Sequence, residues 1–260
     1  MRFRYGVLAI AFSAGVSAQL LQPGEELEYD VSYLGISLGR IRIVTERVDS
    51  LKGRPVVVAT AFMESHPNIP FLSLKAVFRS WLDTSAAFSH RFEGWMQLGD
   101  RPREYGKYVF DYDRRLLIAE EWEGERRTIQ RTFVLRARMN EGLSLLFAAR
   151  RFLHSGKSYR FPTVVTADTH ATIIHFTGQR HAVTVPAFPY PIQAVYFRGT
   201  AEWEGIYGLT GDFEGWFSDD EARVPLRAKM RVYVGNITIE LVRWRREGWQ
   251  PPKAHSGETP

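Results

Sequence analysis

Apolar and polar positions alternate near the end of the chain as they do in a β-hairpin with one buried face. Between residues 226 and 241, apolar side chains recur at every second position on both sides of Gly235 and Asn236. This pair is typical of a tight two-residue turn, and the period agrees with the turn, so we expect a hairpin here. The expected cross-strand pairs are Val234 with Ile237, Val232 with Ile239, Met230 with Leu241 and, on the other face, Tyr233 with Thr238 and Arg231 with Glu240.

The same alternation returns along most of the chain, which indicates a fold made almost entirely of strands. Residues 71–78 suit either a short helix or a strand, and Gly178 followed by Gln179 predicts a tight hairpin between two strands. Strands are expected at residues 27–33, 41–49, 55–61, 81–83, 88–98, 103–111, 116–122, 126–134, 160–165, 169–177, 180–185, 192–204 and 209–217.

Mostly short turns separate these strands, so the sequence predicts an all-β antiparallel meander. A meander of this length leaves exposed edges unless it curves or closes. We therefore expect a barrel-like or strongly curved sheet with one amphipathic helix. A two-sheet β-sandwich is the alternative.

One segment follows helical spacing instead. Leu143 and Leu146 are the first of a series of apolar residues at intervals of three and four between residues 140 and 154. Asn140 is the expected N-cap, and Gly156 suits the position just beyond the last turn. The predicted helix would cover one end or face of the sheet, or bridge two halves of it.

The first residues have the pattern of a secretory leader. Two arginines precede an apolar run over residues 5–16, which is shorter than the roughly 20 residues needed to cross a bilayer. A small-x-small pattern ends at Ala18. We therefore expect a signal peptide at residues 1–18, cleavage before Gln19 and an exported protein, either periplasmic or secreted. No later segment is long and apolar enough to be a membrane span.

Composition narrows the class of protein further. Residues 19–246 are expected to form a single barrel-like domain, and residues 247–260, polar and without periodicity, a disordered tail. The chain has no cysteine, which excludes a disulfide framework, a thiol nucleophile and a lipidated N-terminal cysteine. The 34 basic and 29 acidic residues are too evenly balanced to indicate a nucleic-acid partner.

The histidines do not form a metal-binding pattern. His170 and His175 are five residues apart, so on one strand they point to opposite faces. His181 would share a face with His170, but about 20 Å away along the strands. The sequence also lacks a Gly-x-Ser-x-Gly elbow and a phosphate-binding loop. We predict no catalytic residues, no metal and no cofactor, and we do not expect an enzyme.

The densest group of acidic residues is Asp219-Asp220-Glu221. Neighbouring carboxylates can bind calcium or act in general acid–base catalysis. Ser218 and the aspartates also favour a turn between two strands, in which Arg223 would be close enough to pair with them. The turn is the interpretation that the local sequence favours.

Tryptophans are the candidate ligand-binding residues. Trp95, Trp122, Trp203 and Trp216 lie in expected strands, and on a barrel they would line a cavity for an apolar or sugar ligand. Packing in the core explains them more simply, because aromatic residues are common in strands.

Several stretches together resemble a family of exported bacterial proteins, domain-of-unknown-function family 3108. The most specific is the block from Gly215 to Leu226, whose signature residues are Trp216, Asp220, Arg223 and Pro225. Residues 24–35, the pair Phe110-Asp111 and residues 143–150 are similar as well and follow in the family's order. The resemblance implies a periplasmic or otherwise exported, barrel-like β fold. It implies no activity, and the signature residues would serve to lock a hairpin.

Three functions are compatible with these observations. The first is a non-enzymatic binding or carrier module that holds a lipid, a glycan or another amphiphile against an aromatic concave sheet. The second is a structural or assembly partner of envelope proteins, which binds through an edge strand or arginine-rich strand faces. The third, a polymer hydrolase or lyase, would require Asp219, Asp220, Glu221 and Arg223 to meet in a cleft. We rank them in this order.

Overall fold

The computed structural model describes residues 20–254, apart from residues 71, 206–209 and 233–234. The expected signal peptide at residues 1–18 lies outside the described residues. The strands are β1 (Glu26–Tyr33), β2 (Ile36–Leu51), β3 (Arg54–Ser65), β4 (Leu74–Asp83), β5 (Ser89–Leu98), β6 (Glu104–Asp111), β7 (Leu116–Glu123), β8 (Arg126–Val134), β9 (Ser158–Val165), β10 (Asp168–Val183), β11 (Ile192–Ala201), β12 (Gly211–Ser218), β13 (Pro225–Arg231) and β14 (Asn236–Arg245). The helical segments between β8 and β9 are α2 (Gly142–Phe152) and the 3-10 turn η1 (Leu153–Ser155).

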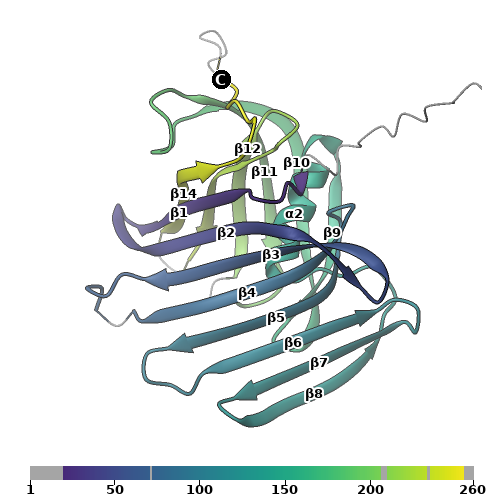
Figure 1. Ribbon diagram of the computed structural model, residues 1–260. Coiled ribbons are helices and arrows are strands. Elements are labelled where there is room, and N and C mark those ends of the chain that lie inside the picture. Colours follow the sequence, from purple (N-terminus) through teal and green to yellow (C-terminus); the bar gives the residue numbers. More distant parts are fainter. Residues whose placement is uncertain (1–19, 71, 206–209, 233–234, 255–260) are drawn as a thin grey trace, which may run out of the picture.

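All of these strands belong to one 14-stranded sheet, in the order β8-β7-β6-β5-β4-β3-β2-β1-β14-β13-β12-β11-β10-β9. Each strand lies antiparallel to its neighbours. The first strand, β1, pairs with the last strand, β14, so these two lie side by side in the middle of the sheet. The sheet curves strongly and does not close, because β8 and β9 remain its two ends (Figure 1). This confirms the predicted antiparallel meander with a strongly curved sheet and one helix.

The two ends of the sheet approach each other through side chains rather than through a strand ladder. The turn between β9 and β10 reaches β6, where the Ala167 N–H donates to the Tyr108 hydroxyl at 3.1 Å. Arg131 of β8 lies 3.5 Å from Asp168 of β10. Ala167 and Tyr108 belong to one buried cluster with Leu117 of β7, so this turn covers the inside of β6 and β7. The barrel-like shape therefore arises without closure of the sheet.

The final hairpin forms, but the predicted register is wrong. Met230 pairs with Ile237 rather than with Leu241, and Arg227, not Arg231, lies opposite Glu240. The connection spans residues 232–235 instead of two residues, which shifts every predicted pair by an even number of positions. Because side chains alternate with a period of two, the shift changed the partners and left the faces as predicted. The predicted pairs with Tyr233 and Val234 lie outside the described residues.

Two segments for which the sequence allowed or predicted another structure lie in strands. Residues 74–78, compatible with helix or strand in sequence, lie in β4 between β3 and β5. The hairpin predicted at Gly178-Gln179 does not exist, because β10 continues through both residues with a break in register between Phe176 and Arg180. A long strand with a bulge bends without reversing, and the glycine with positive φ supplies that bend.

Helix α2 begins one residue later than expected. Glu141, not Asn140, is the N-cap, and its carboxylate accepts hydrogen bonds from the backbone N–H groups of Leu143 and Ser144. The Glu141 N–H in turn donates to the Ser144 hydroxyl oxygen, which completes a reciprocal cap. Asn140 instead pairs with Thr163 of β9. The helix thus starts where the chain is already held to the sheet.

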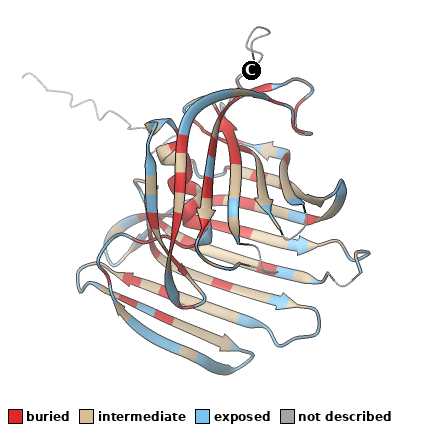
Figure 2. Ribbon diagram, turned by 180° about the vertical axis from the view of Figure 1, so that it is seen from behind, coloured by how far each residue is buried: buried red, intermediate tan, exposed pale blue. Residues whose placement is uncertain are grey.

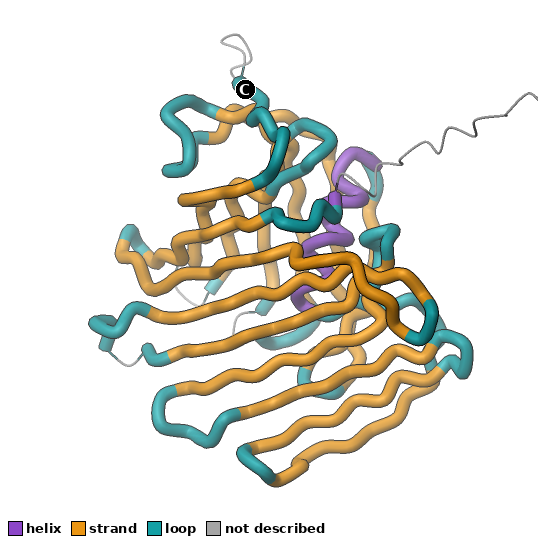
Figure 3. The backbone as a smooth tube through the Cα atoms, in the orientation of Figure 1, coloured by secondary structure: helices purple, strands orange, loops and turns teal. Residues whose placement is uncertain are grey.

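Helix α2 lies inside the curve of the sheet (Figure 3). We call the face of the sheet toward α2 the inner face and the opposite one the outer face. Leu143 and Phe147 pack with Ala59 of β3 and Leu82 of β4, whereas Leu145 packs with Phe197 of β11. Buried residues gather on the helix and on the strands that surround it (Figure 2). The helix therefore joins the two halves of the sheet in one core. This is the second of the two roles predicted for it, a bridge between two halves of the sheet.

The segment after β10 and the end of the chain pack together. Phe188, Trp244 and Trp249 form a cluster with ring centroids 4.8–6.1 Å apart. Lys253 pairs with Ile192 at the start of β11 in an isolated bridge. The tail was predicted to be disordered over residues 247–260, but its described part is bound to the domain. Periodicity could not reveal this, because the segment is held by an aromatic cluster and single backbone bonds.

Candidate functional site

The half of the inner face that α2 does not cover carries apolar side chains. Strand registers place them in two adjoining rows that run across neighbouring strands. One row is Phe213, Met230, Ile237 and Tyr33, and the other is Ile41, Met63, Ala76 and Met96. All of these except Ala76 are only half-buried, as are Val31 and Ile239 between the rows. We call this set the inner apolar surface.

Methionine is frequent on the inner apolar surface. Met63, Met96 and Met230, three of the five methionines of the chain, lie on it. A methionine side chain is unbranched and polarisable, so it adapts to irregular apolar shapes. An apolar surface rich in methionine is suited to ligands without a fixed shape, such as acyl chains.

Glycines opposite phenylalanines keep the inner face shallow. A Cβ atom on Gly94 of β5 would lie 2.5 Å from Cδ1 of Phe78, so the ring lies flat across the glycine of the neighbouring strand. Phe213 lies against Gly199 in the same way, and Phe197 against Gly215. Each ring is therefore held flat against the neighbouring strand instead of standing away from the sheet.

A buried charge cluster closes the other half of the inner face. Glu25, just before β1, accepts from Arg150 of α2 at 2.6 and 3.0 Å and also from Arg246. All three side chains are 4% exposed or less. The Arg223 guanidinium donates to the carbonyls of Arg150 and Arg151 at the end of α2. These contacts are structural, because they hold the helix to β1, to the β12–β13 turn and to the chain after β14.

The family-signature residues surround this cluster. Asp220 accepts hydrogen bonds from the Ser218 hydroxyl, the Arg223 N–H and the Trp249 indole at 2.7–2.9 Å. The Pro225 carbonyl accepts from the Tyr29 hydroxyl of β1, whose pKa is raised by burial. Arg223 adopts a φ of 47°, which the contacts of its side chain hold in place. The signature residues therefore fix a turn against its neighbours.

The acidic cluster predicted at Asp219-Asp220-Glu221 is a turn between β12 and β13. Asp219 lies 2.6 Å from Arg180 and 3.2 Å from His154, Asp220 bonds within the turn, and Glu221 is exposed. Burial, together with the nearby Arg223, lowers the pKa of His154. The two aspartates are thus engaged with basic and backbone groups.

The four candidate tryptophans do not converge on one cavity. Trp95 and Trp122 lie on the outer face, where both are paired with Tyr105 of β6. Trp216 is also on the outer face, and its indole donates to His181 Nδ1 at 2.9 Å. Trp203 donates to the Thr172 hydroxyl at the edge of the second buried cluster. The strand pleat places Trp95, Trp122 and Trp216 outside, because their positions have the parity opposite to the inner apolar surface, whereas Trp203 lies just beyond the end of β11.

The histidines are separate from one another. His170 and His175 lie on β10, and His181 pairs with Ala194 of β11 rather than with Phe176. Within the described ranges, no three histidine, aspartate or glutamate side chains are grouped so that they could hold a metal ion.

One polar contact was missed in the sequence. The Ser37 hydroxyl lies between Asp30 and His66, 2.9 Å from His66 Nε2. In a hydrolase triad the histidine lies between serine and the carboxylate, so the order here is different. Asp30 lies within β1, Ser37 at the start of β2 and His66 just after β3, so their spacing in the sequence gave no sign of the contact.

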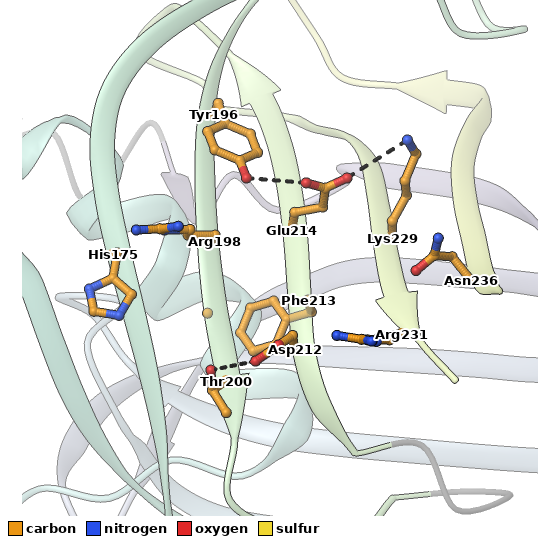
Figure 4. A pocket seen from close by; sticks show the side chains of 11 residues that line it. His175, Tyr196, Arg198, Thr200, Asp212, Phe213, Glu214, Lys229, Arg231 and Asn236 are labelled. Carbon is orange, nitrogen blue, oxygen red and sulfur yellow. Dashed lines mark hydrogen bonds and ion pairs between the residues drawn. The ribbon is translucent and has the colours of Figure 1, made fainter. Parts of the chain in front are cut away.

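The outer face carries a polar groove of about 500 Å³ across β10 to β14 (Figure 4). Glu214 of β12 accepts from the Tyr196 hydroxyl at 3.1 Å and lies 3.7 Å from Lys229 of β13. Asp212 accepts from the Thr200 hydroxyl at 2.8 Å. The sequence prediction missed this groove, because its residues become neighbours only through the registers of separate strands.

The comparison with known families agrees with this architecture. The model of the family described as "Protein of unknown function (DUF3108)" matches residues 28–242 of the chain. The chain belongs to this family. The match begins in β1 and ends in β14, so it spans the whole curved sheet, and it confirms the resemblance inferred from the sequence. A comparison with curated proteins gives no match.

Three solved structures are similar to this DUF3108 protein. A beta-barrel-like protein of domain-of-unknown-function family DUF1849 from Brucella abortus has 10% identity and a TM-score of 0.53, over 85% of this chain and 96% of that one. A proposed exported protein with a YmcC-like fold from Bacteroides fragilis has 9% identity and a TM-score of 0.37, over 86% and 97%. A proposed lipoprotein from Parabacteroides distasonis has 10% identity and a TM-score of 0.36, over 86% of this chain and 96% of that one. The first supports the barrel-like fold alone.

Helices of the described residues give no candidate for a membrane span, since none is long and apolar enough.

Proposed function

We propose that this DUF3108 protein is an exported, non-enzymatic module that binds the apolar part of an amphiphile against its inner apolar surface. The observation that carries the proposal is the row of half-buried Phe213, Met230 and Ile237 on the inner face of the sheet. Export is supported by the leader pattern at residues 1–18.

Energetics favour an apolar ligand at this place. Apolar surface exposed to water gains about 25 cal/mol for each Å² that a ligand covers. Folded proteins seldom leave contiguous apolar surface open without a binding role. Here, helix α2 already covers one half of the inner face, so the other half is the remaining place for an apolar ligand.

The head of the amphiphile would stay outside the curve. The inner apolar surface includes no charged residue, whereas the outer face of the same strands carries the exposed charged side chains of Arg40, Glu64 and Lys75. A molecule with an apolar chain and a polar head would therefore lie with its chain along the strands and its head in water.

The test is the binding of N-phenyl-1-naphthylamine, a fluorescent apolar probe, followed by native mass spectrometry with phosphatidylglycerol and phosphatidylethanolamine. We expect saturable probe binding that either phospholipid displaces. Ile237→Glu places a carboxylate on the inner apolar surface and should weaken binding at least tenfold, because it removes about 1.5 kcal/mol or more of apolar contact. Met96→Gln should weaken binding in the same direction.

Ile118→Glu is the matched control. Ile118 lies on the outer face of β7 and is 36% exposed, so the same substitution there should leave binding unchanged. Circular dichroism should give the same folded spectrum for all variants. Equal binding by Ile237→Glu and Ile118→Glu, or no saturable binding by the unaltered protein, would overturn the proposal.

A further inference from the structure

We propose that the groove on the outer face binds an acidic glycan, independently of the amphiphile site. The groove crosses β10 to β14 and presents rows of side chains that the strand registers align. In one row, Arg198 of β11, Glu214 of β12 and Lys229 of β13 are consecutive neighbours. In the next row, Asp212 of β12 lies beside Arg231 of β13.

The groove carries cations that its own carboxylates do not neutralise. Arg198 and Arg231 are exposed, and no hydrogen bond or ion pair within the described part of the chain engages either guanidinium. Lys229 makes only a loose pair with Glu214 at 3.7 Å. Such arginines offer planar donors suited to bidentate bonds with carboxylates or other oxyanions.

The carboxylates in the middle of the groove select the kind of anion. Figure 4 shows Glu214 and Asp212 on the central strand, with Arg198 on one side and Lys229 and Arg231 on the other. Glu214 already accepts a hydrogen bond from the Tyr196 hydroxyl, and Asp212 accepts one from the Thr200 hydroxyl. Each carboxylate retains further acceptor sites. They would accept bonds from the sugar hydroxyls that accompany the acidic groups of a uronic acid polymer, whereas they would repel a polyanion without hydroxyl donors.

A groove in which cationic and carboxylate side chains alternate therefore fits a polymer that bears both hydroxyls and acidic groups. Arg198 and Lys229 are two strands apart, which places their backbones about 10 Å from each other. A saccharide lying across the strands would meet a cation, a carboxylate and a second cation in turn. Single-stranded DNA and a polyacidic peptide lack the matching hydroxyl donors.

Titration calorimetry with tetragalacturonic acid tests this directly, with maltotetraose as the neutral glycan of equal length. We expect tetragalacturonic acid to bind and maltotetraose to bind at least tenfold more weakly. The double variant Arg198→Gln and Arg231→Gln should reduce binding at least tenfold. Arg114→Gln with Arg136→Gln, which alters exposed arginines on other parts of the surface, should leave it unchanged.

Other polyanions complete the test. Equal affinity for polyglutamate or for single-stranded DNA, or no binding of tetragalacturonic acid, would overturn the proposal. Met96→Gln, on the inner apolar surface, should bind tetragalacturonic acid as the unaltered protein does. Retention of glycan binding by that variant separates this proposal from the amphiphile site, since either one can fail without the other.

Discussion

Asp83 illustrates at the residue scale how local contacts decide the charge state of a partly buried group. Its carboxylate lies 3.2 Å from His90 Nε2 and accepts from the Ser85 N–H at 2.9 Å. Burial alone would raise the pKa of Asp83. The bonds from His90 and Ser85 outweigh that effect and lower the pKa from its ordinary 3.8 to about 2. The folded state therefore prefers the ionised carboxylate.

The lowered pKa of Asp83 predicts how the stability of the folded protein changes with pH. Because the folded pKa lies below the unfolded one, the stabilisation by Asp83 is present above pH 3.8 and is lost as the pH falls toward about 2. Asp83→Asn should be less stable than the unaltered protein at neutral pH, and the difference should shrink between about pH 4 and 2. Urea unfolding of both proteins over this range measures it. A difference independent of pH would contradict the assigned pKa.

At the scale of elements, cross-strand pairs of phenylalanine and glycine shape the inner face. The ring of Phe78 in β4 occupies the place of a side chain at Gly94 in β5, and Phe92 lies against the same glycine. Glycine usually weakens a strand because it offers no side chain to pack. Here the neighbouring rings supply the packing, so the glycine lets them lie flat.

Gly94→Ala should force the Phe78 ring out of this position. The new Cβ would lie 2.5 Å from Cδ1 of the ring, so we expect a loss of about 1–3 kcal/mol in the free energy of unfolding. Gly106, directly opposite Gly94 on β6, is the control, because a Cβ there meets nothing closer than 3.7 Å. Gly106→Ala should be neutral or slightly stabilising by about 0.5 kcal/mol. Equal losses in urea unfolding would refute the steric explanation.

At the scale of the whole molecule, one buried carboxylate joins segments from distant parts of the chain. Glu25 precedes β1, Arg150 ends α2 and Arg246 follows β14, and all three meet inside the protein. Burying charges is costly unless they are paired with good geometry. Two guanidiniums share the Glu25 carboxylate here, so its negative charge offsets part of the cost of burying both of them.

Glu25→Gln should therefore be strongly destabilising. The substitution removes the carboxylate that the buried Arg150 and Arg246 share, and removing one partner from a buried pair costs about 3–5 kcal/mol. Thermal and urea unfolding should both show the loss. Glu123→Gln breaks the exposed pair with Arg126 and should change stability by less than about 1 kcal/mol. A similar small loss for Glu25→Gln would show that the cluster does not hold the three segments together.

The sequence by itself determined the class of fold and the faces of its strands. Alternation at residues 27–33 and 226–241, with short turns between strands, led to an antiparallel meander, and helical spacing at Leu143 and Leu146 located the helix. These features depend on neighbours within a few positions, which the sequence contains directly. The predicted faces survived even where the register of the last hairpin was wrong, because a shift by an even number of residues preserves the pleat.

Only the tertiary structure decided which residues meet. The ends of the sheet, the outward position of Trp95 and Trp122 and the meeting of Glu25 with Arg246 depend on curvature and on registers that accumulate over many strands. The outer groove shows this most clearly, because Arg198, Glu214 and Lys229 become neighbours only when three strands are aligned. The physical reason is that pairing between distant segments is fixed by the packing of the whole core, whereas periodicity records only how each strand exposes its own two faces.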